Sequence, residues 1–168
     1  MNEVNNIHSL SIALFEPRIP QNTGNIARTC AAFNLQLQLI EPLGFSLESK
    51  LLKRAGLDYW PYMDIINHKS FNSFYTTLTP SNRLIGFSKA ADKNLFDLSF
   101  TLGDILIFGR EDTGLSNDVK EKCLDIVSIP MPGGVSKESL VGVRSLNLSS
   151  SVAIVAYQAS LRLGLLSN

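Results

Sequence analysis

The chain has 168 residues, 45% of them hydrophobic, a length that suits one domain with an ordinary core better than two domains. Lys and Arg together number 15, as do Asp and Glu, so the formal net charge is zero. Nucleic-acid binding through overall charge is therefore excluded, and any RNA contact needs a local basic patch. No apolar run reaches the ~18 residues of a membrane span and the first residues lack a signal-peptide pattern, so we expect a cytoplasmic protein.

The first predicted element is a buried strand over residues 10–15, an almost wholly apolar run. Pro17 and Pro20 end this strand, since neither residue can continue a strand ladder. Gly24 then allows the backbone to turn into a helix over residues 25–33. The first strand and the first helix are therefore expected to be joined by a polar turn.

This turn and the start of its helix carry two amides and an arginine. Asn22 and Asn25 suit turn formation and helix capping. Arg28 stands among apolar helix neighbours, where an arginine either extends to solvent or binds an anion such as phosphate or carboxylate. The residues of this segment alone leave both interpretations open.

Strand and helix patterns alternate along the rest of the chain. Further strands are predicted at residues 35–40, 64–67, 83–88, 104–108 and 125–129, and further helices at residues 46–55, 70–78, 117–123 and 148–163. This alternation predicts an α/β fold, a mostly parallel sheet with helices on both faces. We expect a single domain over residues 1–168 without a separate RNA-binding domain. Ligands of such sheets bind beyond the carboxyl ends of the strands.

A charged turn flanked by glycines follows the strand at residues 104–108. Gly109 and Gly114 could let the backbone approach a flat ligand closely, although an ordinary charged turn is the simpler interpretation of this segment alone. No two glycines of the chain are separated by a single residue, so the dinucleotide fingerprint G-x-G-x-x-G is absent. A nucleoside-type ligand would need loops of another shape.

Three polar residues, Ser145, Asn147 and Ser149, open the last helix. Their ordinary role is N-capping, and the alternative is that one hydroxyl or amide contacts a substrate. The same helix carries an apolar stripe that suits a core or an interface: Val152, Val155, Ala156 and Ala159.

A basic cluster lies on the helix predicted at residues 46–55. Lys50, Lys53 and Arg54 suit either a local RNA contact or a solvated helix face. Cys30 and Cys123 are far apart in sequence, which favours two free thiols in a reducing compartment over a disulfide. We expect no metal site, because neither the cysteines nor the two histidines have ligand spacing.

Taken together, three segments resemble the motifs of the SPOUT methyltransferases, specifically the SpoU-type 2′-O-ribose RNA methyltransferases. They are residues 22–28, residues 109–115, and residues 129–131 with 145–149. The resemblance covers nearly the whole chain. Within the family, residues 15–25 and 54–59 resemble the small enzymes that methylate the wobble ribose of tRNA, at cytidine or uridine 34.

The resemblance implies a C-terminal trefoil knot that binds S-adenosylmethionine, a homodimer whose paired knots form the site, and the tRNA anticodon stem-loop as substrate. The positions that match cofactor contacts of the family are Phe87, Gly109, Ile129 and Ser145. Arg28 matches the proposed general base, with Asn22, Glu111 and Asn147 around it. Because arginine is effectively always protonated, Arg28 could instead lower the pKa of the ribose hydroxyl while a substrate phosphate or water takes the proton.

Two departures from the family pattern bear on RNA recognition. Residues 132–143 stand where the family usually has a short bridge, and we expect a mobile loop there. Asp112 and Thr113 occupy a turn in which relatives often carry a basic residue. Two alternatives to the wobble-ribose enzyme stay open: a SpoU-type enzyme for another tRNA or rRNA ribose, and a knotted RNA-binding protein without catalysis.

Overall fold

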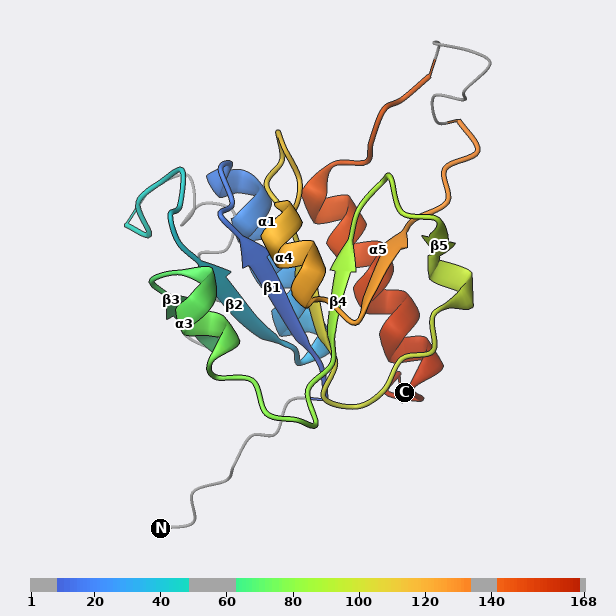
Figure 1. The fold of residues 1–168 in the computed structure, drawn as a ribbon, viewed down its shortest axis with the longest axis horizontal. Coiled ribbons are helices and arrows are strands. Elements are labelled where there is room, and N and C mark those ends of the chain that lie inside the picture. Colours follow the sequence, from blue (N-terminus) through green and yellow to red (C-terminus); the bar gives the residue numbers. More distant parts are fainter. Residues whose placement is uncertain (1–8, 49–62, 134–141, 167–168) are drawn as a thin grey trace.

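The computed structural model describes residues 9–48, 63–133 and 142–166 (Figure 1). The basic cluster expected at residues 50–54 and most of the loop expected at residues 132–143 lie outside the described residues. The elements in chain order are β1 Ser11–Phe15, α1 Pro20–Phe33, β2 Gln36–Ile40, β3 Ile65–His68, α3 Phe71–Tyr75, β4 Leu84–Phe87, β5 Lys93–Asn94, the 3-10 helix η2 Leu95–Asp97, β6 Ile105–Phe108, α4 Asn117–Lys122, β7 Asp125–Ser128 and α5 Leu148–Arg162.

The described residues form seven strands of one sheet, in the order β3-β2-β1-β6-β4-β7-β5. Every pairing between these strands is parallel; in the centre, Leu14 of β1 lies opposite Leu39 of β2 on one side and Phe108 of β6 on the other. Because parallel strands all end at the same edge, the loops that follow them meet there, at the upper edge of the sheet in Figure 1. The predicted mostly parallel sheet is confirmed.

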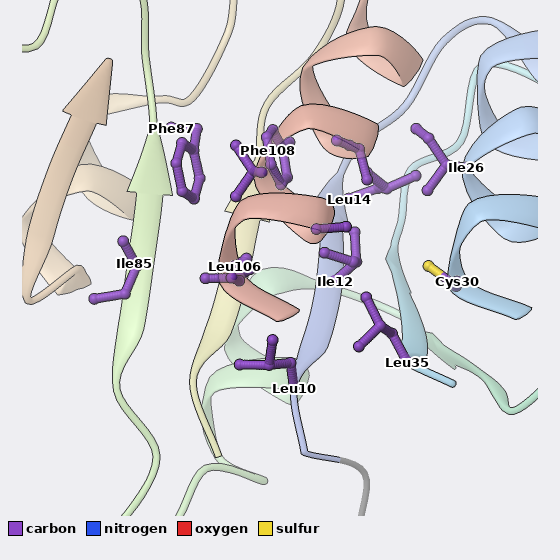
Figure 2. Close-up of a cluster of buried hydrophobic side chains, with 14 of the residues drawn as sticks. Leu10, Ile12, Leu14, Ile26, Cys30, Leu35, Ile85, Phe87, Leu106 and Phe108 are labelled. Atoms are coloured by element: carbon purple, nitrogen blue, oxygen red, sulfur yellow. The ribbon is translucent and has the colours of Figure 1, made fainter. Parts of the chain in front are cut away.

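Helices cover both faces of the sheet, as the alternating pattern predicts. On one face α1 and α5 pack side by side against a buried apolar cluster, part of which Figure 2 shows, with Ile12 and Leu14 of β1 facing Ile26 of α1. On the other face, Phe74 of α3 and Val119 of α4 cover a second cluster. The α5 stripe at Val152, Val155, Ala156 and Ala159 is fully buried in the first cluster, so of its two interpretations the structure supports core rather than interface.

The first helix begins earlier than the sequence predicts. α1 starts at Pro20, so that Asn22 and Gly24, expected in a turn, lie within the helix and are buried. Proline suits the first helical position because that residue has no helical partner for an N–H and needs the φ angle that the ring fixes. Pro20 is therefore the start of a helix and not only the end of a strand.

Two features of the described residues bear on the expected compartment. Cys30 and Cys123 are both free thiols, and burial raises the pKa of Cys30 well above its usual range and that of Cys123 to about 12. Both side chains are therefore inert packing groups, as the sequence suggests. In the described parts of the chain, we find no helix with the length and apolar character needed to span a bilayer.

Candidate functional site

A cavity of about 620 Å³ lies at the carboxyl edge of the sheet, where the loops after β4, β6 and β7 meet the start of α5. It brings together seven of the eight site residues predicted from the sequence: Asn22, Phe87, Gly109, Glu111, Ile129, Ser145 and Asn147. These residues come from five separate segments, and the parallel topology gathers them at one place. Their individual roles stay predictions.

The inner wall of the cavity is apolar and aromatic. Phe87 and Phe108, at the ends of β4 and β6, stack with ring centroids 4.7 Å apart and an interplanar angle of 9° (Figure 2). Val127 and Ile129 extend this surface along β7 and the residues after it. Together with the backbone of the loop after β6, these side chains suit a flat ligand with polar edges.

The loop after β6 folds back on itself, and this requires glycine at its first position. A Cβ atom on Gly109 would lie 2.1 Å from the carbonyl carbon of Gly114 and 2.2 Å from the nitrogen of Leu115. Arg110 and Gly114 exchange two backbone hydrogen bonds across the turn, and Gly114 has a φ of 73°. Gly109 is therefore needed for the closure of its own turn, and the close approach of its backbone to a ligand stays a prediction.

Substitution of Gly109 by alanine is expected to lower the free energy of unfolding by about 3 kcal/mol or more, because the new methyl group meets backbone that has to move. Urea unfolding measures the loss. Gly133→Ala is the matched control, since no atom lies within 4 Å of a Cβ placed there. Equal free energies of unfolding of the two variants would show that the turn accommodates the methyl group without loss of stability.

Glu111 holds the segment that leads into α1. One carboxylate oxygen accepts the Arg18 backbone N–H at 2.8 Å; the other accepts the Ile19 N–H at 3.2 Å and the Asn22 side-chain amide at 3.1 Å. Ile19 is the N-cap of α1 and supplies no side-chain cap of its own. A carboxylate from another loop thus stabilises this helix N-terminus, where negative charge is favourable.

A chain of amides continues from Glu111 to α5. The Asn22 side-chain oxygen accepts the Asn147 amide at 3.0 Å. The Asn147 oxygen in turn accepts the backbone N–H of Ser149 at 2.8 Å and its hydroxyl at 2.7 Å. Asn147 therefore caps α5, as one interpretation predicts, and its amide group also fixes Asn22. The network therefore fixes the Asn22 and Asn147 amides at the cavity wall, although one belongs to α1 and the other to the start of α5.

Charged groups form a second network beside the first. Glu16 lies 3.5 Å from the Arg18 guanidinium and 3.4 Å from that of Arg110. Arg110 also donates two hydrogen bonds to Asp112, at 2.9 and 2.7 Å, in a bidentate pair. These bonds hold the pKa of Asp112 well below its usual range, so the pair stays ionised.

Arg28 is the one predicted site residue that the cavity of its own chain does not include. Its side chain is exposed on α1. It lies six positions after Asn22, which places the two side chains about 120° apart around the helix. Arg28 therefore lies apart from the cavity of its own chain, and the expected grouping of Asn22, Glu111 and Asn147 around it stays a prediction for the homodimer.

Sequence reasoning missed the cavity residues that directly follow β4. Ser88, Lys89 and Ala90 line the cavity beside Phe87. The rule that ligands bind beyond the carboxyl ends of parallel strands could have found them, since the strand at residues 83–88 was predicted. Among the residues that the structure describes, no cluster of acidic, histidine and cysteine side chains suits a metal ion.

Comparison with known proteins gives consistent matches over the cavity-forming part of the chain. The SpoU rRNA methylase family matches residues 9–157. The tRNA (cytidine(34)-2′-O)-methyltransferase of Saccharophagus degradans is 40% identical, covering 92% of this chain and 96% of its own length. The protein of the same name from Polaromonas sp. is 39% identical, covering 89% and 88%.

A solved structure that concerns the 2′-OH methylation of C/U34 on tRNA is 44% identical to this chain. It superimposes with a TM-score of 0.86 and covers 94% of this chain and 97% of its own. The similarity thus extends over nearly the full length of both proteins, including the segments that line the cavity.

Proposed function

The chain belongs to the SpoU rRNA methylase family, and on that premise we propose that it is an RNA methyltransferase that transfers a methyl group from S-adenosylmethionine to the 2′-hydroxyl of the wobble ribose, cytidine or uridine 34, of tRNA. The observation that carries this proposal is the 44% identity over nearly the full length to the solved structure concerned with C/U34 methylation. A cytoplasmic location follows from the tRNA substrate.

The cavity fits S-adenosylmethionine in size and chemistry. A volume of about 620 Å³ is in the ordinary range for cofactor sites. The stacked pair of Phe87 and Phe108 and the side chain of Ile129 offer apolar contact to a base, while backbone groups of the loop after β6 offer hydrogen bonds to polar edges. When bound, the cofactor supplies a methyl group on a sulfonium, ready for in-line displacement.

Catalysis by this chain consists of alignment and of removing a proton from a poor acid. The amide chain from Glu111 through Asn22 to Asn147 keeps the cavity wall in one arrangement. Arg28 supplies a fixed positive charge that lowers the pKa of the ribose hydroxyl, or holds the phosphate that takes the proton, because a protonated guanidinium has no lone pair to act as a base itself.

We also propose that the carboxyl-terminal part of the fold is a trefoil knot. It is supported by the return of the chain after β7, which places residues 145–147 beside the loop after β6 in the cavity wall. The Asn147 to Asn22 hydrogen bond then ties the start of α5 to α1. In this proposal the same domain that binds the cofactor also contacts the RNA.

A homodimer would complete the site. α5 carries an exposed apolar stripe at helical spacing, Ile154, Tyr157 and Leu161, with exposed fractions of 41%, 53% and 51%. Tyr157 packs edge-on against Phe33 of α1, so this stripe adjoins the helix that bears Arg28. Pairing through the stripe would bring Arg28 of one chain to the cavity of the other, which accounts for its absence from the cavity of its own chain.

Substitution of Ile154 by glutamate is expected to convert a dimer into a folded monomer, because a carboxylate replaces apolar surface at the proposed contact. Light scattering at micromolar concentration measures the mass. Leu124→Glu is the matched control, since Leu124 is 63% exposed outside α5 and should leave the dimer intact. A monomeric parent protein would contradict the proposed pairing.

Methyl transfer from radiolabelled cofactor to an anticodon stem-loop RNA tests the function itself. The matched control substrate carries a 2′-deoxy sugar at position 34 and so lacks the nucleophile. We expect incorporation only into the RNA with the ribose, and none into rRNA fragments. Incorporation into the deoxy control would show that another nucleotide is methylated. No incorporation into any RNA would favour a protein without catalysis.

A further inference from the structure

The guanidinium of Arg110 is held between two carboxylates of different exposure. Glu16, with 21% of its side chain exposed, lies 3.4 Å away on the inner side. Asp112, with 56% exposed, forms the bidentate pair on the solvent side. Both Arg110 and Asp112 line the cavity, and the Arg110 side chain is 25% exposed.

The turn around Arg110 fixes its backbone independently of Asp112. The two backbone bonds between Arg110 and Gly114 close the turn. The contact from Glu16 to Nη1 holds the guanidinium on the side away from Asp112. The pair with Asp112 can therefore open without unfolding the loop, and exposed ion pairs of this kind exchange at little net cost in free energy.

We propose that Arg110 binds an oxyanion entering the cavity, a phosphate of the substrate RNA, and that Asp112 is an internal competitor which occupies the guanidinium fork until the phosphate displaces it. The planar guanidinium can donate two parallel hydrogen bonds to a phosphate, in the same geometry in which it now donates them to the Asp112 carboxylate. This inference rests on the proposed function, since it names the group that recognises the substrate of that same cavity.

Two lysines of the cavity attract an incoming anion and offset part of the negative charge of Glu16 and Asp112. Lys89 and Lys120 line the same cavity as Arg110. The carboxylate of Glu111 is already engaged by three N–H donors, so it presents little free negative charge to the cavity. Asp112 is then the main carboxylate that a phosphate must displace. Because the overall charge of zero gives RNA no net long-range attraction, local cationic groups such as this fork have to supply its phosphate contacts.

Asp112→Asn tests the competition with little disturbance of the loop, because asparagine keeps the Oδ1 atom that accepts the Thr113 backbone N–H at 2.8 Å. The dissociation constant for an anticodon stem-loop RNA, measured by fluorescence anisotropy, is expected to fall about two- to fivefold. Asp97→Asn is the charge-matched control, since Asp97 is exposed on η2 and does not line the cavity. It should leave the RNA dissociation constant unchanged.

Arg110→Gln should weaken RNA binding. It should also reduce the magnitude of the slope of log affinity against log salt by about one, the value expected for one lost phosphate contact. In the double variant the gain from Asp112→Asn should vanish, which shows that Asp112 acts through Arg110. Calorimetric affinity for the demethylated cofactor should change less than RNA affinity in every variant, because the contacts that we propose between this loop and the cofactor come from backbone groups.

The proposal is overturned if Asp112→Asn binds RNA no better than Asp97→Asn, if its gain persists in the Arg110→Gln background, or if cofactor affinity changes instead of RNA affinity. Any of these results leaves the proposed function intact as long as the parent protein methylates the stem-loop. A parent protein that neither binds nor methylates RNA would overturn both.

Discussion

Arg28→Ala is expected to lower the rate of ribose methylation by about a hundredfold to ten-thousandfold while leaving cofactor affinity nearly unchanged. That range is typical for loss of one positioned proton-transfer or electrostatic group. The two effects separate because Arg28 lies outside the cavity that we assign to the cofactor. Its exposed position on α1 also makes a folding defect a small part of the expected loss.

Single-turnover methylation of an anticodon stem-loop with saturating cofactor measures this rate, and calorimetry measures cofactor affinity for the same variants. Arg28→Lys should be nearly as slow, because a point charge does not reproduce a planar fork. Gln21→Ala is the control on the same helix, since Gln21 is also exposed and lies outside the cavity. Near-normal turnover of Arg28→Ala would make the residue structural and assign proton removal elsewhere.

Mixing variants tests whether Arg28 acts across a dimer. Inactive Arg28→Ala chains should form mixed dimers with chains inactivated in the cavity. In such a dimer, one site combines the intact cavity of the Arg28→Ala chain with Arg28 of the other chain. Activity should therefore return on mixing, up to about half of the parent rate per mixed dimer. Absence of any recovery, with mixed dimers present, would place Arg28 in the site of its own chain and contradict the proposed pairing.

Apolar runs made the central strands predictable. The run at residues 10–15 became β1, and the one at residues 104–108 became β6, because strands buried on both faces need almost continuous apolar sequence. β5 was not predicted, since two residues show no periodicity. The alternating polar residues of β2 were predictable as strand but not as core: Gln38 is buried because its side chain bonds the His68 ring at 2.9 Å.

The sequence also predicted which residues gather at the cavity better than what each does there. The resemblance to the SpoU-type enzymes named Phe87, Gly109 and Ile129, and they line one cavity because parallel topology brings the ends of their strands to one edge. The partners of Glu111 could not be predicted, because two of them are backbone N–H groups that sequence patterns do not show. The side of α1 that Arg28 occupies could not be predicted, because the sequence placed the start of this helix at residue 25 and not at Pro20.

Glu111→Gln is expected to slow methylation by about a hundredfold while the protein stays folded. The amide keeps one oxygen for Ile19 and Asn22, but its NH₂ group then faces the Arg18 backbone N–H, so that two donors oppose each other. Release of this contact lets the start of α1, and with it Asn22, shift against the cavity. A displacement of about 1 Å at a reacting site can cost a hundredfold in rate.

Single-turnover rates and thermal unfolding should be measured together, with Glu121→Gln on α4 as the control because Glu121 is exposed and outside the cavity. A positioning role predicts that the maximal rate falls more than cofactor affinity does, and that Asn22→Ala in the Glu111→Gln background adds little further loss, since both changes break the same network. Fully additive losses would instead mean that Glu111 contacts the substrate directly and that its hydrogen bonds to α1 are incidental to the reaction.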